Sequence, residues 1–304
     1  MDVLVLTDGY PFPIENGQAL RIFHYVRLLR RRHNFDLMCT ADGAPPEPVR
    51  ALFRNVAAVP HPAAVRRSSL ACLRDAFSVD GLVARNPALE TRLRVRLAQT
   101  SYDIVWVSGD AALAALPPEV SVPILGDLVD AGVLALARSL RRTDGVLSFL
   151  KTLKRGLLVA LYERRHFGRA DRCLLVSEID ARWFRRLCPR TPTDVIHNGV
   201  DAEFFAPMAV SEDPCNLVFE GNLAFGPNSD AVVHFCRAIL PRIRREMPGV
   251  TFTVVGKNPP AEVRALACDH VAVTGFVEDI RPHVARAAVF VSPLRKGAGI
   301  KNKL

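Results

Sequence analysis

Short apolar runs alternate along the chain with stretches in which apolar residues recur every three or four positions. Residues 2–7 (DVLVLT) form the first run, and a loop rich in Gly and Pro follows at 9–18. Helical spacing then begins at Ala19 and continues through Leu20, Phe23 and Leu28. The next run is FDLMCT (35–40). A strand, a glycine-bearing loop, a helix and a second strand predict a βαβ unit.

The same alternation continues to the end of the chain. Helices are expected between the strands, including one at 146–167. A further helix, which contains Val232 and Met247, is predicted to have Asn228 or Ser229 as its N-cap. Pro241 is expected to kink or interrupt that helix. Near-continuous apolar strands are typical of parallel sheets, whose two faces are both covered. Further strands are predicted at 103–108, 122–127, 172–177, 193–198, 216–221, 250–256, 271–275 and 288–293.

A segment with turn residues and little periodicity, NGVDAEFFAPMAVSEDP (198–214), separates the two halves. The predicted fold class is therefore α/β, with two Rossmann-like doubly wound domains facing a cleft. We expect the first domain to span residues 1–198 and the second to span 199–304.

Composition narrows the class of protein. With 304 residues, 49% of them apolar, the chain can fill two domain cores. It contains no apolar run of about 18 residues, and its N-terminus has no basic segment of the signal-peptide kind. Seven scattered cysteines, never spaced CxxC, favour reduced thiols in a cytoplasm over disulfides or a zinc site.

Positive charge is concentrated in the first 200 residues, which carry +8 of the net +9. The charge is densest at 138–190, where it forms either solvated helix faces or a surface for an anionic lipid or acceptor. We expect no nucleic-acid partner, because the chain has no aromatic-rich basic motif of the RNA-binding kind.

The segment 146–161 (VLSFLKTLKRGLLVAL) places apolar residues along one helical stripe, with Lys151, Lys154 and Arg155 off it. Two interpretations stay open. The helix lies on an anionic membrane with its lysines reaching outward, or the stripe packs on the sheet of the first domain. The second interpretation requires the stripe to be buried.

Glycine-containing turns provide the candidate ligand sites. The chain has no GxGxxG fingerprint and no Walker A motif, which argues against a dehydrogenase or P-loop ATPase. In SPLRKGAGIKNKL, Gly297 and Gly299 would expose backbone N–H groups near a helix N-terminus, and Lys301 and Lys303 add positive charge. Two positions apart, the lysines cannot both lie on one helix face, so we expect Lys301 nearer the anion and Lys303 turned away from it or in contact with the segment between the domains. A diphosphate fits this description; a solvent-facing loop is the alternative. Gly17, after the first strand, is a weaker signal.

Several stretches, in order, resemble the retaining glycosyltransferases of family 4, also called group 1, which have the two-domain GT-B fold. The resemblance is greatest to an exopolysaccharide-type subgroup and covers nearly the whole chain. It is carried by LTDGYPFPIENGQALRIFHYVRLLRRRH, VSEIDARWF, VIHNGVDAEFFAP, LVFEGNLAFGPNSDAVVHFCRAILPRI, FTVVGKNP, VTGFVEDIRPHVARAAVFVSPL and GAGIKNKL.

The resemblance assigns roles to residues on the donor side. Gly17 would belong to the loop that closes over the donor phosphate, and Gly221 would follow the first donor-domain strand. Many relatives have Arg after that glycine and Lys a few residues later; this chain has Asn222 and Pro227-Asn228 instead. Lys301, helped by Arg295 or Lys296, would then neutralise more of the diphosphate. Phe276 and Val277 would contact the nucleotide base, and Gly297 and Gly299 would hold the diphosphate.

On the acceptor side, Asp127 or Asp130 falls near a position where many relatives carry a sugar-contacting His; a capping or ion-paired Asp is the alternative. Glu163 either faces the same cleft or lies on a helix surface. In the family, a Glu and a helix follow the GAGIKNKL-like motif. The resemblance therefore implies a donor domain that is truncated at its C-terminus, and a fragment that is itself inactive.

The function implied is retaining transfer of a sugar from a nucleotide-diphosphate sugar to a glycan or polyprenyl-linked acceptor, in surface polysaccharide synthesis. Helix dipole and lysine, not metal, would stabilise the leaving diphosphate, so no cofactor is expected. The protein would be cytoplasmic and peripheral on the inner face of the plasma membrane. The alternatives are a non-catalytic nucleotide-sugar-binding protein of the same fold and a sugar-nucleotide epimerase.

Overall fold

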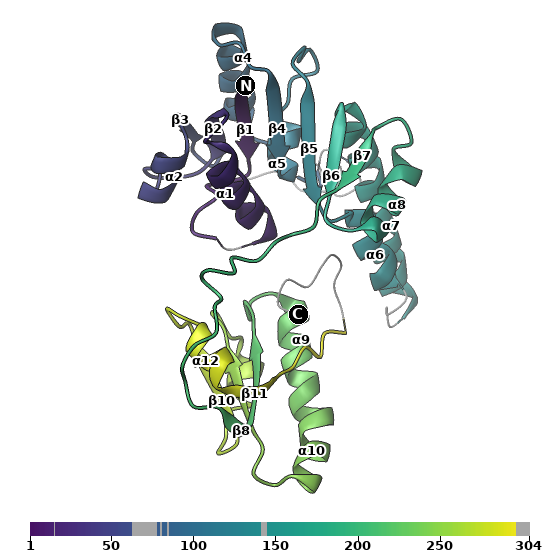
Figure 1. Ribbon diagram of the computed structural model, residues 1–304. Coiled ribbons are helices and arrows are strands. Elements are labelled where there is room, and N and C mark those ends of the chain that lie inside the picture. The colour runs from purple at the N-terminus through teal and green to yellow at the C-terminus, as the bar shows by residue number, and fades with distance from the viewer. Residues whose placement is uncertain (15, 63–77, 80, 84, 141–144, 296–304) are drawn as a thin grey trace. The chain divides into compact units, whose positions relative to one another are not determined.

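The computed structural model describes residues 1–14, 16–62, 78–79, 81–83, 85–140 and 145–295. The chain divides into two compact units, and the boundary lies between Asn198 and Gly199. Each unit is built on a parallel sheet with helices packed against it, so the chain has the doubly wound α/β architecture (Figure 1). The two units are described separately.

A seven-stranded parallel sheet forms the core of the first domain, in the order β3-β2-β1-β4-β5-β6-β7. Val5 of β1 lies opposite Leu37 of β2 on one side and Trp106 of β4 on the other. Val5 is fully buried, which explains why this strand has an uninterrupted apolar sequence. The strands are β1 (Asp2–Thr7), β2 (Asn34–Thr40), β3 (Asn55–Val59), β4 (Ile104–Ser108), β5 (Ile124–Val129), β6 (Arg172–Leu175) and β7 (Thr193–Val195).

Helices cover both faces of this sheet. Ile22 of α1 (Gly17–Leu29) and Val49 of α2 (Glu47–Leu52) are buried in the apolar core on one face. The core on the other face contains residues of α4 (Pro87–Gln99), α5 (Asp110–Ala114), α6 (Gly132–Leu140) and α8 (Glu178–Leu187). The long helix α7 (Val146–His166) packs against α6 and continues into a short 3₁₀ turn, η1 (Phe167–Arg169). Figure 1 shows α6, α7 and α8 grouped beside β6 and β7.

The second domain has a four-stranded parallel sheet in the order β10-β9-β8-β11. Its core includes Phe219 of β8, and Phe235 and Phe252, whose ring centroids are 4.6 Å apart. The strands are β8 (Asp213–Glu220), β9 (Thr251–Val255), β10 (Val271–Gly275) and β11 (Ala287–Phe290). The helices are α9 (Gly226–His234), α10 (Leu240–Glu246), α11 (Ala261–Arg264) and α12 (Arg281–Arg286), with a π-helical turn η2 (Phe235–Ile239) between α9 and α10.

Several local predictions are confirmed. The predicted interruption near Pro241 is present, because a π-helical turn precedes this proline, which lies in the first turn of α10. The helix predicted at 146–167 is α7. The prediction that Asn228 or Ser229 is a helix N-cap in the second domain is wrong. Helix α9 already begins at Gly226, and both residues lie buried in its first turn. The edge strand β3 (NVAAV) was not predicted.

The apolar stripe of α7 is exposed. Val146 is 76% exposed, and Leu150, Leu157 and Leu161 are each more than half exposed. The interpretation that this stripe packs on the sheet of the first domain is therefore wrong. No helix in the described ranges combines the length and apolarity needed to cross a bilayer.

Candidate active site

The carboxyl edge of the first sheet gathers several polar residues, as expected for the ligand-binding edge of an open α/β sheet. Gly17 is the first residue of α1, and the side chain of Asn16 caps that helix by accepting the N–H of Ala19 at 2.8 Å. A side chain at Gly17 would approach Val129 at the end of β5. Gly17 is thus adjacent to the strand end that carries Asp127 and Asp130.

Asp127 is fully buried and bound to Arg21. The Nε of Arg21 donates to both carboxylate oxygens, at 3.1 and 3.2 Å, and both side chains are at most 1% exposed. Nη1 of Arg21 also donates to the carbonyl of Ile196 and to Oδ1 of Asn198. Asp127 therefore has no surface to offer a sugar in this structure, and we correct its assignment from sugar contact to the alternative, an ion-paired structural Asp.

Asp130, in contrast, lies at the surface of a cavity. It follows Val129, whose φ of 64° is unusual for a β-branched residue, at a point where the pairing of β5 with β6 shifts register. Strained backbone of this kind is enriched at functional sites. The strain places Asp130 beyond the strand end, so it is the better candidate of the two aspartates for contact with a substrate.

The cavity next to Asp130 has a volume of about 670 Å³ and lies wholly within the first domain. Its wall comes from the start of α1, from residues near 82, and from α5, α6 and α7. The polar residues that line it are Gln18, Asp110, Asp130, Ser139, Lys151, Thr152, Arg155, Tyr162 and Glu163. A cavity of this size falls within the range of small-molecule sites, roughly 300–1,000 Å³.

Glu163, near the end of α7, is one of the residues that line the cavity, and its side chain is only 5% exposed. Its Oε1 accepts the N–H of Gly132 at 2.6 Å, at the start of α6. Burial raises the pKa of Glu163 to about 7, although the bond from Gly132 opposes the rise. The interpretation of Glu163 as a helix-surface residue is wrong, because its side chain is buried. That Glu163 faces the cleft between the domains stays a prediction.

A further carboxylate at this edge was not predicted from the sequence. Asp8 follows β1 directly, and its Oδ1 accepts the N–H of Ala112 in α5 at 2.7 Å. Burial raises its pKa to about 6, although the bond from Ala112 opposes the rise. Gly109 has a φ of +125°, and a Cβ there would clash with the Asp8 carboxyl group. Asp8 therefore organises the loop before α5.

In the second domain, Gly221 and Asn222 form the turn between β8 and α9. Oδ1 of Asn222 accepts the N–H of Ala224 at 3.1 Å, and its carbonyl accepts from Nδ2 of Asn228 at 2.9 Å. The hydroxyl of Ser229 donates to the carbonyl of Leu223. Asn222 thus shapes the backbone that leads into the N-terminus of α9, where an anion is favoured.

Three glycines meet where β8, β9 and β10 end. The N–H of Gly221 donates to Val255, and the N–H of Gly256 donates to Gly275 at 3.1 Å. A Cβ on Gly256 would lie 1.9 Å from the carbonyl oxygen of Gly221, so only glycine fits there. In the sequence, Gly256 is marked only by the Val-Val-Gly that ends the predicted strand 250–256.

Phe276 and Val277 follow Gly275, which has a φ of +72°. Phe276 is 72% exposed, so its ring is available to stack on a flat ligand. The nearby Asp279 is held by Arg281, whose Nη2 donates to it at 2.7 Å. In the described residues, no group of three or more His, Cys, Asp or Glu side chains could hold a metal ion.

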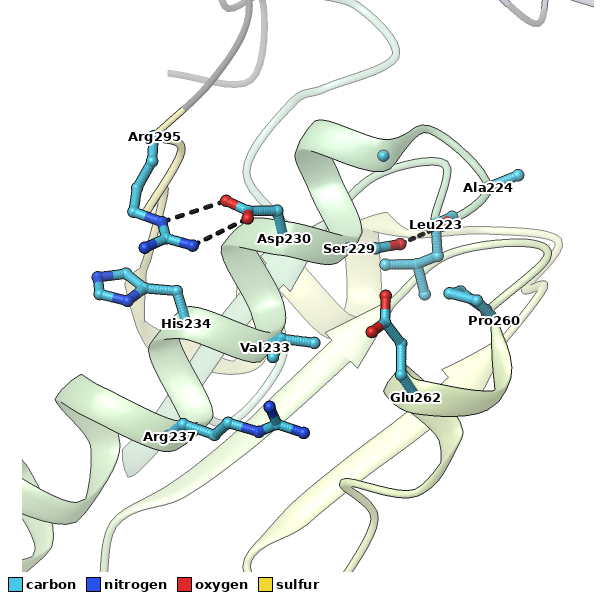
Figure 2. Close-up of a pocket in the computed structure, with 11 residues that line it drawn as sticks. Leu223, Ala224, Ser229, Asp230, Val233, His234, Arg237, Pro260, Glu262 and Arg295 are labelled. Atoms are coloured by element: carbon cyan, nitrogen blue, oxygen red, sulfur yellow. Dashed lines mark hydrogen bonds and ion pairs between the residues drawn. The ribbon is translucent and has the colours of Figure 1, made fainter. Parts of the chain in front are cut away.

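A pocket of about 620 Å³ lies beside α9 (Figure 2). Arg295 binds Asp230 there through two bonds, at 2.8 and 3.1 Å, and Glu262 of α11 lies across the pocket from Val233. Arg295 was expected to help neutralise a diphosphate, but Asp230 already holds its guanidinium group. Gly297, Gly299 and Lys301, together with Lys296, lie outside the described residues.

Comparison with known sequences gives matches over both domains. A family model described as Glycosyltransferase Family 4 matches residues 15–204, and one described as Glycosyl transferases group 1 matches residues 214–304. The chain is also similar to the GDP-mannose-dependent alpha-(1-6)-phosphatidylinositol monomannoside mannosyltransferase of Mycobacterium tuberculosis strains CDC 1551 and H37Rv. The identity is 28% over 242 residues, which are 70% of this chain and 56% of the relative. The chain thus spans a little over half the length of the curated relatives it matches.

Solved structures show the same fold. WaaG, a glycosyltransferase involved in lipopolysaccharide biosynthesis, superposes with a TM-score of 0.61 at 15% identity, over 97% of this chain and 75% of WaaG. Anabaena HepE, solved with UDP and glucose, gives a TM-score of 0.57 at 16% identity, over 95% of this chain and 73% of HepE. Two Rossmann-like domains, family matches along both, and GT-B neighbours agree with one another, and the chain belongs to glycosyltransferase family 4.

Proposed function

We propose that the protein transfers a sugar, with retention of anomeric configuration, from a nucleotide-diphosphate sugar to a glycan or lipid-linked acceptor in surface polysaccharide synthesis. Family membership supports glycosyl transfer as the reaction class. The mycobacterial relative is named for mannosyl transfer from GDP-mannose to a phosphatidylinositol mannoside, which supports a nucleotide-sugar donor and a glycolipid type of acceptor. The observation that carries the proposal is the convergence of Gly221, Gly256 and Gly275 at the carboxyl edge of the second sheet.

The chemistry proposed for the second domain is electrostatic. A Cβ on Gly275 would meet nothing within 4 Å, so a phosphate can approach the backbone closely at the end of β10. Phe276 offers a ring face to the base. Lys301 and the backbone of Gly297 and Gly299 would stabilise the charge that develops on the departing diphosphate. In this proposal no metal is needed, and EDTA should leave the rate unchanged.

A donor-consumption assay tests the proposal against its two alternatives. The protein is incubated with UDP-glucose or GDP-mannose, with and without a bacterial lipid extract, and both nucleoside diphosphate release and the sugar of the remaining donor are followed. A transferase releases nucleoside diphosphate faster when lipid is present. A changed donor sugar without lipid would support an epimerase. Nucleotide binding without any turnover would support a non-catalytic binding protein.

We further propose that the protein is cytoplasmic and binds the inner face of the plasma membrane through α7. The exposed apolar residues of this helix are Val146, Leu147, Phe149, Leu150, Leu153, Leu157 and Leu161, here named the α7 ridge. Five basic residues accompany the ridge on the same helix, and the single acidic residue, Glu163, is buried. Contiguous exposed apolar surface marks an interaction site, and the charge favours an anionic lipid surface.

Vesicle co-sedimentation tests this location. Binding should rise with the fraction of phosphatidylglycerol in phosphatidylcholine vesicles and fall as salt increases, because basic residues contribute part of the attraction. If the protein stays in the supernatant with phosphatidylglycerol vesicles at low salt, the ridge does not bind membranes.

A further inference from the structure

Arg281, the first residue of α12, uses every part of its guanidinium group. Nε and Nη2 donate to the carboxylate of Asp279 at distances between 2.7 and 3.1 Å, and Nη1 donates to the backbone carbonyl of Phe204 at 2.9 Å. The guanidinium carbon also lies 3.9 Å from the centroid of the Phe204 ring. Phe204 is 77 positions earlier in the chain, so these contacts join two distant segments of the second domain.

A surface ion pair alone does not explain this arrangement. The side chains of Arg281 and Asp279 are 30% and 34% exposed, and pairs at such positions contribute little to stability. The bond to the carbonyl of Phe204 and the contact with its ring need a planar guanidinium group in one fixed orientation. Arg281 is therefore placed to hold the segment that contains Phe204.

Phe204 belongs to a short turn, residues 201–205, here named the linker turn. The carboxylate of Asp201 accepts the N–H of Phe204 at 3.1 Å, and the carbonyl of Asp201 accepts the N–H of Phe205 at 2.9 Å. Two residues separate this turn from the last residue of the first domain. The linker turn is therefore continuous with the connection between the domains, and Arg281 fixes it to the second domain.

Asp279, the other partner of Arg281, ends the loop that carries Phe276. Gly275 fixes the start of this loop, because its carbonyl accepts the N–H of Gly256 at 3.1 Å. Asp279 fixes its end, because it binds the guanidinium group of Arg281 and also accepts the backbone N–H of Arg281 at 2.9 Å. Three residues lie between these fixed points, and Phe276 is the first of them. A ligand that moves Phe276 therefore displaces Asp279 or strains a very short loop.

We propose that Arg281 is a positioning residue that transmits occupancy of the Phe276 loop to the linker turn. When a nucleotide stacks on Phe276, Asp279 moves with the loop, and Arg281 carries this movement to the carbonyl and ring of Phe204. The inference rests on the proposed function, because its ligand is the nucleotide of the donor. The path from the loop to the linker turn consists of the contacts of Arg281.

A fluorine reporter in the linker turn tests the transmission. Phe205 is replaced by tryptophan (Phe205→Trp), because its ring lies 5.0 Å from that of Phe204 and is 49% exposed. The protein is labelled with 5-fluorotryptophan, and Trp106 and Trp183 of the first domain serve as internal references. UDP and GDP are titrated by ¹⁹F NMR, and calorimetry on the same samples measures binding. At saturation the signal of residue 205 should shift.

Arg281→Lys separates transmission from binding, because lysine keeps the charge beside Asp279 but not the planar guanidinium group. Its affinity for the nucleotide should change by less than about threefold. The signal of residue 205 should nevertheless lose most of its shift. Arg286→Lys is the matched control and should keep both, since Arg286 is an exposed residue in the last turn of the same helix. Phe204→Leu, which removes the ring contact, replaces Arg281→Lys if that variant does not fold.

The inference is overturned if a nucleotide binds without a shift of the signal of residue 205, or if Arg281→Lys keeps the full shift. It is also overturned if neither nucleotide binds, a result that removes donor binding from the proposed function as well. Donor consumption is measured on the same preparations. A shift that depends on Arg281, in a protein that consumes no donor, would remove the transferase function alone.

Discussion

Glu163 should make the stability of the protein depend on pH near neutrality. Its pKa is 4.5 as a free side chain and about 7 in the folded protein. Between these values the folded state holds a proton that the unfolded chain has released, so stability falls as pH rises from about 4.5 to 7. In Glu163→Gln this loss is absent. The variant should be more stable than the wild type at pH 8, by up to roughly 3 kcal/mol.

Urea unfolding of both proteins at pH 5 and pH 8 checks this expectation. The difference in free energy of unfolding should widen by roughly 2–3 kcal/mol over that range. Asp8 is present in both proteins, so its own titration cancels. A constant difference between wild type and Glu163→Gln would mean that Glu163 is ionised in the folded protein throughout.

The sequence could not distinguish Asp127 from Asp130. Both follow the same apolar strand, three residues apart, and only Asp127 is paired with Arg21, which lies 106 positions earlier. Pairing over such a distance leaves no local pattern. The sequence around Glu163 does contain a signal of its burial. It is the single acidic residue of a helix with five Lys and Arg, and it lies on the side away from the apolar stripe.

Helix α7 lies between the proposed membrane contact and the cavity, which are on its two opposite sides. Leu150→Glu combined with Leu157→Glu should abolish binding to phosphatidylglycerol vesicles, because the charges replace exposed apolar side chains. The melting temperature should change little, since these positions are 54% and 60% exposed. Leu28→Glu is the control, because Leu28 is 70% exposed on α1, away from the α7 ridge. Equal loss of vesicle binding in Leu28→Glu would mean that the α7 ridge is not the contact.

Gly256 is the residue on which the turn geometry of the second domain depends. Gly256→Ala should lower the free energy of unfolding by about 2 kcal/mol or more, because its Cβ would overlap the backbone carbonyl of Gly221. Gly226→Ala is the control, since a Cβ there meets nothing within 4 Å. Urea unfolding compares the two variants. A similar, small effect of both would show that the turns at Gly221 and Gly256 can separate without penalty.

Strands could be predicted from the sequence where both of their faces are buried. The apolar runs of β1 and β9 identify them because both faces of a parallel strand lie under helices. β3 (Asn55–Val59) was missed because it is an edge strand with two alanines and three half-buried positions, which gives a weak pattern. Helix α7 was predictable from the helical spacing of its apolar residues. The exposure of these residues was not predictable, because an apolar stripe has the same sequence whether it faces a core or a membrane.

At the scale of the whole molecule, each domain carries candidate ligand-binding residues at the carboxyl edge of its parallel sheet. In the first domain, carboxylates and cations surround a cavity, which suits recognition of hydroxyl groups and phosphate. In the second, glycines and an exposed aromatic ring suit a nucleotide. The proposed function therefore places the acceptor in the first domain and the donor in the second. If it is correct, the second domain binds a nucleoside diphosphate.

Isothermal titration calorimetry with UDP and GDP measures nucleotide binding by the wild type, Lys301→Ala and Lys303→Ala. The wild type should bind at least one of the two nucleotides. Lys301→Ala should lose roughly 1.5–3 kcal/mol of binding free energy, because it removes a charge-assisted contact to phosphate, and Lys303→Ala should lose less. If the wild type binds neither nucleotide, or if only Lys303→Ala loses affinity, the second domain does not bind the donor in the proposed way.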